Sequence, residues 1–70
     1  MLQQIPISSS LISQLAYDDE RKELHVTFKR SGARWIYGPG VTQDDADGVE
    51  TGGGSWFLEN VKGRYSERRA

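Results

Sequence analysis

Basic side chains gather in two stretches of the 70-residue sequence, and they could bind the phosphates of a nucleic acid. Residues 21–34 hold five lysines and arginines against one glutamate, and residues 59–70 hold four against two acids. Cations neutralise phosphates, and an exposed aromatic ring beside them can stack on a base. The predicted nucleic-acid- or partner-binding residues are Lys29, Arg30, Arg34, Lys62, Arg64 and Tyr65.

An acidic segment offers the opposite chemistry. The four acids Asp44, Asp45, Asp47 and Glu50 lie within seven residues. They could imitate the charge of a nucleic acid and so form an alternative site for a protein partner. Their alternation resembles a calcium loop, but the glycine and the distal bidentate glutamate of such a loop are not in place. We therefore expect a solvated acidic surface and no metal site.

The residues that catalysis most often uses are scarce. His25 is the one histidine, and there is no cysteine. A histidine acts as a general base when a third group orients it, and no spacing in this sequence supplies a Ser-His-Asp arrangement. The alternation around His25 predicts a solvent-facing side chain on a strand. We expect a protein that is not an enzyme and has no cofactor.

Three strands are expected to position these side chains. They cover residues 11–17, 24–29 and 33–38. In the clearest of them, Leu24, Val26 and Phe28 alternate with polar residues, which is the period of a strand with one buried face. Ser31-Gly32 is typical of a tight hairpin turn. Short connections favour an antiparallel meander, so the predicted fold is α+β, a three-stranded antiparallel β-meander followed by one or two short helices.

The second half of the chain has weaker signals. Thr42 and Asp45 have the spacing of a capping box, but Gly48 interrupts the apolar positions that follow. We expect residues 42–51 to form either a short, fraying helix or an acidic loop. The three glycines at 52–54 predict a flexible hinge, and a final helix is expected from Ser55.

The aromatic residues allow two interpretations. In a chain this short the core needs large rings, so Trp35, Tyr37 and Phe57 are expected to be mainly buried. Tyr65, which follows Arg64 and lies near Lys62, is the aromatic residue that we expect to be exposed. A strip of polar and basic side chains is expected on the opposite face of the sheet, either as a solvated surface or as a dock for phosphates. Its members are His25, Thr27, Lys29 and Arg34.

The sequence resembles the KTSC domain, a family of small modules named for the C-terminus of some lysyl-tRNA synthetases and also found as stand-alone bacterial and phage proteins. The matching pieces, within about residues 8–66, are Ser9-Ser10-Leu11-Ile12, Tyr17-Asp18, Leu24-His25-Val26-Thr27-Phe28, Trp35-Ile36-Tyr37, Gly54-Ser55-Trp56-Phe57 and Val61-Lys62-Gly63-Arg64-Tyr65. The sequence departs from the family at residues 38–51, where an apolar helix is replaced by acids and glycines. The resemblance implies no catalytic activity, and RNA binding has been suggested for the family.

Composition narrows the remaining expectations. Residues 1–70 are expected to form a single domain, since 36% of them are hydrophobic and 27% charged, with a net charge of −1. No apolar run is long enough to span a membrane. The expected location is the cytoplasm, which for a viral protein means the host cytoplasm. The expected partner is RNA or a nucleic-acid-handling protein, and homo-oligomers are possible. The alternative is a phage-type accessory protein that binds a bacterial host protein, inhibiting or redirecting it, or that sequesters a small nucleotide.

Overall fold

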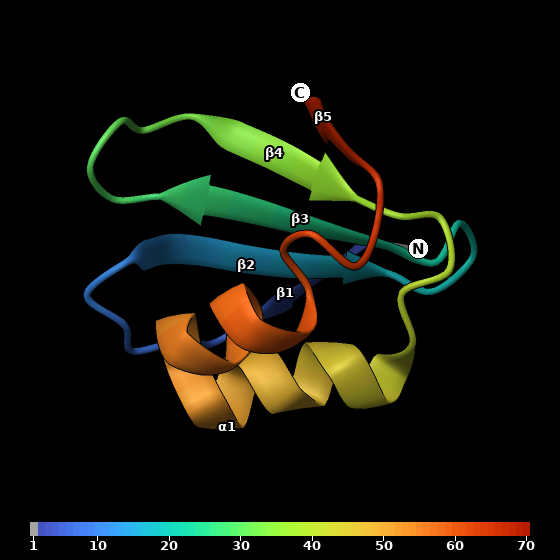
Figure 1. Ribbon diagram of the computed structural model, residues 1–70, viewed down its shortest axis with the longest axis horizontal. Helices are drawn as coiled ribbons and strands as arrows, with labels where there is room; N and C mark the ends of the chain where they lie inside the picture. Colours follow the sequence, from blue (N-terminus) through green and yellow to red (C-terminus); the bar gives the residue numbers. More distant parts are fainter. Residues whose placement is uncertain (1) are drawn as a thin grey trace.

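The computed structural model describes residues 2–70 and contains one antiparallel sheet with one helix packed on it (Figure 1). The elements in chain order are β1 (Leu2–Ile5), β2 (Ile12–Asp18), β3 (Glu23–Phe28), β4 (Arg34–Tyr37), α1 (Gln43–Asn60) and β5 (Glu67–Arg69). The strands lie in the sheet in the order β1-β2-β3-β4-β5. The predicted α+β class and antiparallel meander are confirmed, but the prediction of three strands is wrong, because the sheet has five.

The two unpredicted strands are the edges of the sheet. β1 has the sequence LQQI, and residues 6–11, which follow it, form no helix or strand. β5 consists of a glutamate and two arginines, all exposed. Edge strands are often short and charged, which protects the sheet against pairing with other chains. Neither strand has an apolar alternation, so each is defined by hydrogen bonds to a neighbour, β2 or β4.

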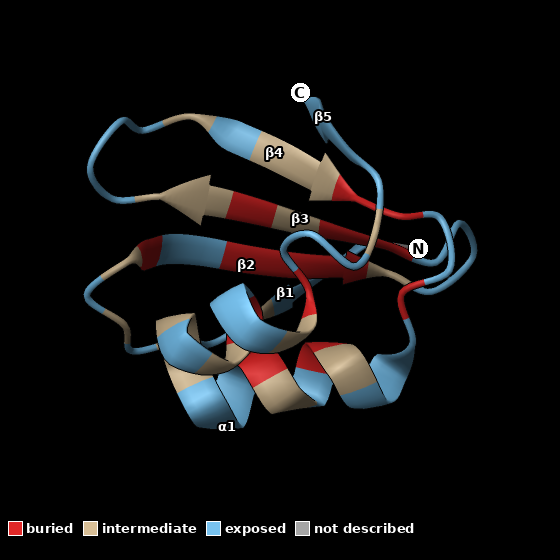
Figure 2. Cartoon of the chain, viewed as in Figure 1, coloured by how far each residue is buried: buried red, intermediate tan, exposed pale blue. Residues whose placement is uncertain are grey.

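The core lies between α1 and the inner face of the sheet (Figure 2). Strands β2, β3 and β4 supply fully buried side chains such as Leu15, Val26 and Tyr37. α1 supplies Ala46, Val49 and Phe57 from the other side. The prediction that Tyr37 and Phe57 are core residues is confirmed, and Trp35 packs against the same cluster while partly buried. These apolar contacts hold α1 against the sheet.

The register of the strands defines the outer face, which α1 does not cover. His25 pairs with Ala16 on β2 and with Ile36 on β4, and Thr27 pairs with Arg34. Residues that are directly opposite in an antiparallel pair point to the same side of the sheet. The predicted placement of His25, Thr27 and Arg34 on one face is therefore confirmed.

α1 begins at the predicted capping box. The backbone N–H of Asp45 donates to Thr42 Oγ1 at 3.1 Å, and the N–H of Thr42 donates to Asp45 Oδ2 at 3.4 Å. Of the two alternatives expected for residues 42–51, the helix is confirmed and the acidic loop is wrong: Thr42 is the N-cap, and residues 43–51 are helical. This cap and the burial of Ala46 and Val49 offset the cost of the internal glycine.

The glycine triplet lies inside α1 and bends it. Gly53 has φ 67° and ψ −152°, a non-helical conformation that favours glycine, and the helix continues on both sides of it. The second stretch of α1 turns back beside the first (Figure 1). The predicted hinge position is thus a kink between two helical stretches.

Trp56 explains two of the other glycines. A Cβ atom on Gly48 would lie 2.4 Å from Cζ2 of the Trp56 ring, and one on Gly52 would lie 2.4 Å from Trp56 Cβ. The first helical stretch therefore has glycines where the Trp56 side chain, coming from the second stretch, packs against it.

Candidate functional site

Three of the predicted cations belong to the hairpin that joins β3 to β4. Lys29 and Arg30 lie in its turn, which is closed by the N–H of Gly32 donating to Phe28 O at 2.9 Å. Arg34 begins β4. All three side chains are exposed, and within residues 2–70 none of them forms an ion pair. We call Lys29, Arg30 and Arg34 the hairpin cations.

The other two predicted cations are partly engaged by neighbours. Lys62 Nζ lies 3.8 Å from Oε2 of Glu67, and the Arg64 guanidinium lies 5.8 Å from the centre of the Tyr65 ring. Both residues are in the segment between α1 and β5, on a different part of the chain from the hairpin. The structure therefore divides the predicted basic set into two groups, and the charge of the second group is partly neutralised.

Tyr65 is not the exposed aromatic residue that the sequence predicts. It is half-buried and packs against the hydrophobic core. Its hydroxyl donates to Oδ2 of Asp45, twenty residues away. This hydrogen bond, with burial adding to it, raises the pKa of Tyr65 above its usual range. Tyr65 therefore connects the segment before β5 to the start of α1, and its hydroxyl hydrogen is used in the bond to Asp45.

The same contact changes the acidic segment. Asp45 accepts hydrogen bonds from Tyr65 and from the N-cap backbone, so its carboxylate has a structural role. Asp44, Asp47 and Glu50 remain exposed on the solvent side of α1. Since they are spaced three residues apart, they lie on neighbouring turns of the helix. The exposed acidic surface therefore consists of three of the four predicted residues, without Asp45.

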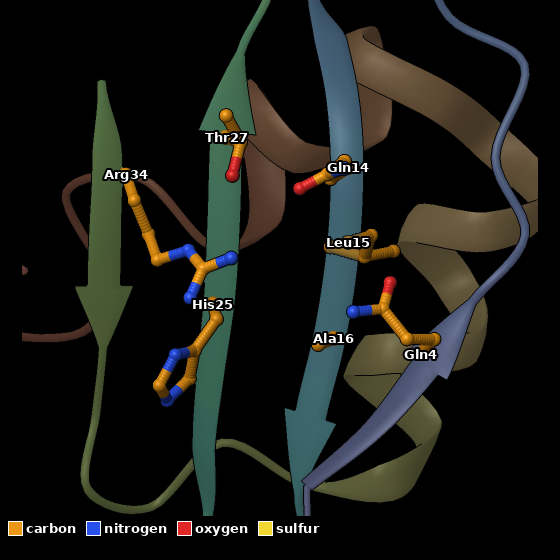
Figure 3. Close-up of a pocket in the computed structure, with 7 residues that line it drawn as sticks. All are labelled: Gln4, Gln14, Leu15, Ala16, His25, Thr27 and Arg34. Carbon is orange, nitrogen blue, oxygen red and sulfur yellow. The ribbon is translucent and has the colours of Figure 1, made fainter. Parts of the chain in front are cut away.

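Figure 3 shows the outer face of the sheet, where the Arg34 side chain extends from β4 and its guanidinium ends near His25 on β3. The Nδ1 atom of His25 is buried and has no hydrogen-bond partner. Burial, together with the nearby Arg34 guanidinium, lowers the pKa of His25 below its usual range. His25 is half-buried rather than fully solvent-facing, and no acid or hydroxyl among the described residues accepts from or donates to its Nδ1.

Among residues 2–70, no three histidine, cysteine, aspartate or glutamate side chains gather closely enough to hold an ion. Within residues 2–70, no helix has the length and apolar character that crossing a bilayer requires.

The sequence interpretation overlooked the residues that adjoin the hairpin. The backbone N–H of Lys29 donates to Leu11 O at 2.9 Å, which brings residues 8–11 beside the turn. Ser10 and Leu11 line a hollow together with Lys29 and Arg30. The run of serines at 8–10 is the signal in the sequence that could have indicated this neighbourhood.

Tyr65→Phe tests the link between the two predicted sites. We expect the free energy of unfolding, measured in urea at pH 7, to fall by about 1.5 kcal/mol, the usual contribution of a hydrogen bond to a charged group. In an Asp45→Ala background the same change should cost much less, because the acceptor is gone. Equal losses in both backgrounds would show that the hydrogen bond does not contribute.

The stability that Tyr65 contributes is expected to depend on pH. Because folding raises the pKa of Tyr65, this contribution to the free energy of unfolding is present below pH 10 and is lost as the pH rises further.

Comparison with known proteins identifies the fold. No family model matches the sequence, and no curated protein matches it. Among solved structures, a KTSC domain protein from Yersinia pestis superposes with a TM-score of 0.86 at 26% sequence identity, and the match covers 100% of this chain and 99% of that chain. The resemblance to KTSC domains seen in the sequence is therefore confirmed by the fold, which this chain shares with that protein over its whole length.

Proposed function

We propose that this chain is a small, non-enzymatic binding module that binds single-stranded RNA, alone or within a nucleic-acid-handling machine, through the hairpin cations. The observation that carries the proposal is that Lys29, Arg30 and Arg34 are exposed on one hairpin and form no ion pair with any residue of the described range 2–70. Unpaired cations release bound counterions when they contact phosphates, which is the main sequence-independent contribution to affinity.

The aromatic residues support a backbone-binding mode. Tyr37 and Phe57 are fully buried, and Trp35, Trp56 and Tyr65 pack against the core. Stacking on bases needs an exposed ring face. The proposed module therefore recognises phosphates and the shape of the strand, with little discrimination between sequences.

A pair of matched double variants tests this proposal. Lys29→Ser with Arg30→Ser removes two hairpin cations, and Lys62→Ser with Arg64→Ser removes the same residue types from the other group. RNA affinity is measured by fluorescence anisotropy at several salt concentrations. We expect the hairpin variant to bind at least tenfold more weakly at low salt and its salt slope to fall by about 1.4, since each phosphate contact on a single strand contributes roughly 0.7. The Lys62 and Arg64 variant should change both quantities much less.

Two outcomes would count against the proposal. Equal losses in the two variants would show that general positive charge, and not the hairpin, attracts RNA. No RNA binding by the unchanged protein at low salt would contradict RNA binding altogether. That result would favour the second candidate function, binding of a host protein through the exposed carboxylates Asp44, Asp47 and Glu50 of α1.

A further inference from the structure

A groove runs beside the hairpin, at the end of the molecule where α1 is kinked. It consists of two hollows that share Ser10 and Leu11 in their walls. One hollow, of about 430 Å³, is lined in addition by Lys29 and Arg30. The other, of about 490 Å³, is lined in addition by Ser8, Ser9, residues 52–55 and Leu58. We call the two together the serine groove.

The walls of the groove are held in place by contacts within the protein. Ser9 Oγ accepts hydrogen bonds from the N–H groups of Leu11 and Ile12, at 3.1 and 3.2 Å, which fixes the loop after β1. Gly54 allows α1 to approach this loop closely, since a Cβ atom there would lie 2.9 Å from Leu11 Cβ. The groove is therefore a preformed feature of three segments that are far apart in the sequence.

The chemistry of the walls changes along the groove. Lys29 and Arg30 form a cationic end, exposed serine hydroxyls lie in the middle, and Leu11 and Leu58 give an apolar surface. Leu58 is 50% exposed, although the neighbouring Phe57 is fully buried. Leu11 is partly buried and packs against the core. In a small-molecule site, apolar lining contributes affinity and a few polar groups set the orientation of the ligand.

We propose that the serine groove binds one nucleoside monophosphate unit. Its phosphate lies at Lys29 and Arg30, its ribose hydroxyls face the serines, and its base packs on the leucine side chains. Each hollow has a volume within the usual range for small-ligand pockets, roughly 300–1,000 Å³. None of the described residues that line the two hollows is aromatic, so the base is held by aliphatic contact and the groove accepts both purines and pyrimidines. This inference rests on the proposed function, because both use Lys29 and Arg30.

The test is an NMR titration of the full chain, following backbone amide shifts with inorganic phosphate, AMP and UMP. Two matched variants accompany it: Leu58→Gln removes an exposed leucine from the groove, and Leu2→Gln removes one from β1, outside the groove. We expect AMP and UMP to bind at least tenfold more tightly than phosphate, with shifts at Leu11, Gly54 and Leu58. Leu58→Gln should lower their affinity toward that of phosphate and leave phosphate unchanged, whereas Leu2→Gln should change neither.

Equal affinities for AMP and phosphate, or no effect of Leu58→Gln, would overturn the nucleotide groove. If RNA still bound through the hairpin cations in that case, the proposed function would survive.

If AMP does bind in the serine groove, a competition experiment identifies the source of the nucleotide. Displacement by an RNA hexamer with a 5′-phosphate, but not by one with a 5′-hydroxyl, indicates the end of an RNA. Displacement by both indicates an internal unit, and displacement by neither indicates a free nucleotide.

Discussion

Phe57→Ala is expected to lower the free energy of unfolding by roughly 3–5 kcal/mol, the usual range for removing a buried aromatic ring. The Phe57 ring is fully buried. It meets the Tyr37 ring edge to face, with centroids 5.1 Å apart, and lies 5.8 Å from the ring of Phe28. It is also the buried residue of the second helical stretch, so its loss leaves a cavity and loosens that stretch from the sheet.

The loss is large relative to the total stability of such a domain. A chain of this length has a free energy of unfolding of roughly 4–10 kcal/mol, so the variant is expected to be partly unfolded at 37 °C. Urea unfolding followed by tryptophan fluorescence measures the change. The neighbouring substitution Leu58→Ala is the control, and we expect it to cost less than about 1 kcal/mol because that side chain is half exposed. Similar losses of unfolding free energy in the two variants would contradict the buried packing of Phe57.

Gly48→Ala is expected to destabilise the protein by about 1–3 kcal/mol, the usual cost of overpacking. The expected sign is opposite to the general rule, because alanine within a helix is normally more stable than glycine by roughly 1 kcal/mol. At this position the added methyl group would lie 2.4–2.6 Å from three atoms of the Trp56 ring. The ring would have to leave its place against the first helical stretch.

A second background makes the cause of the effect visible. In a Trp56→Ala protein the obstacle is gone, and Gly48→Ala should then stabilise by roughly 0.5–1 kcal/mol. Thermal or urea unfolding of the four proteins of this cycle gives the coupling between the two residues. If Gly48→Ala stabilised both backgrounds, the Trp56 ring would be free to move, and close packing would not explain the glycine.

Local patterns in the sequence were sufficient for the central elements. Alternation at Leu24, Val26 and Phe28 predicted β3 because a strand with one buried face needs apolar residues at every second position. Thr42 and Asp45 predicted the start of α1 because a capping box lies within four consecutive residues. Such features depend on neighbours in the chain, and the structure confirms them.

Elements that depend on distant partners were missed or misjudged. β1 and β5 have no apolar alternation, and they are strands because β2 and β4 supply their hydrogen bonds. The helical stretch around Gly48 was interpreted as weak because glycine has a low helix propensity, but packing with Trp56 requires a glycine there. In both cases a tertiary contact outweighs the local propensity.

For the candidate site, the sequence by itself determined which charges are present, and the hairpin turn determined that Lys29 and Arg30 lie together. Only the tertiary structure decided which charged side chains are engaged by other residues. Tyr65 donates a hydrogen bond to Asp45, and Glu67 lies beside Lys62. It also brought the serines of residues 8–10 to the kink of α1. The physical reason is that ion pairs and grooves form between side chains that are close in space, whereas sequence patterns report only the chain's own neighbours.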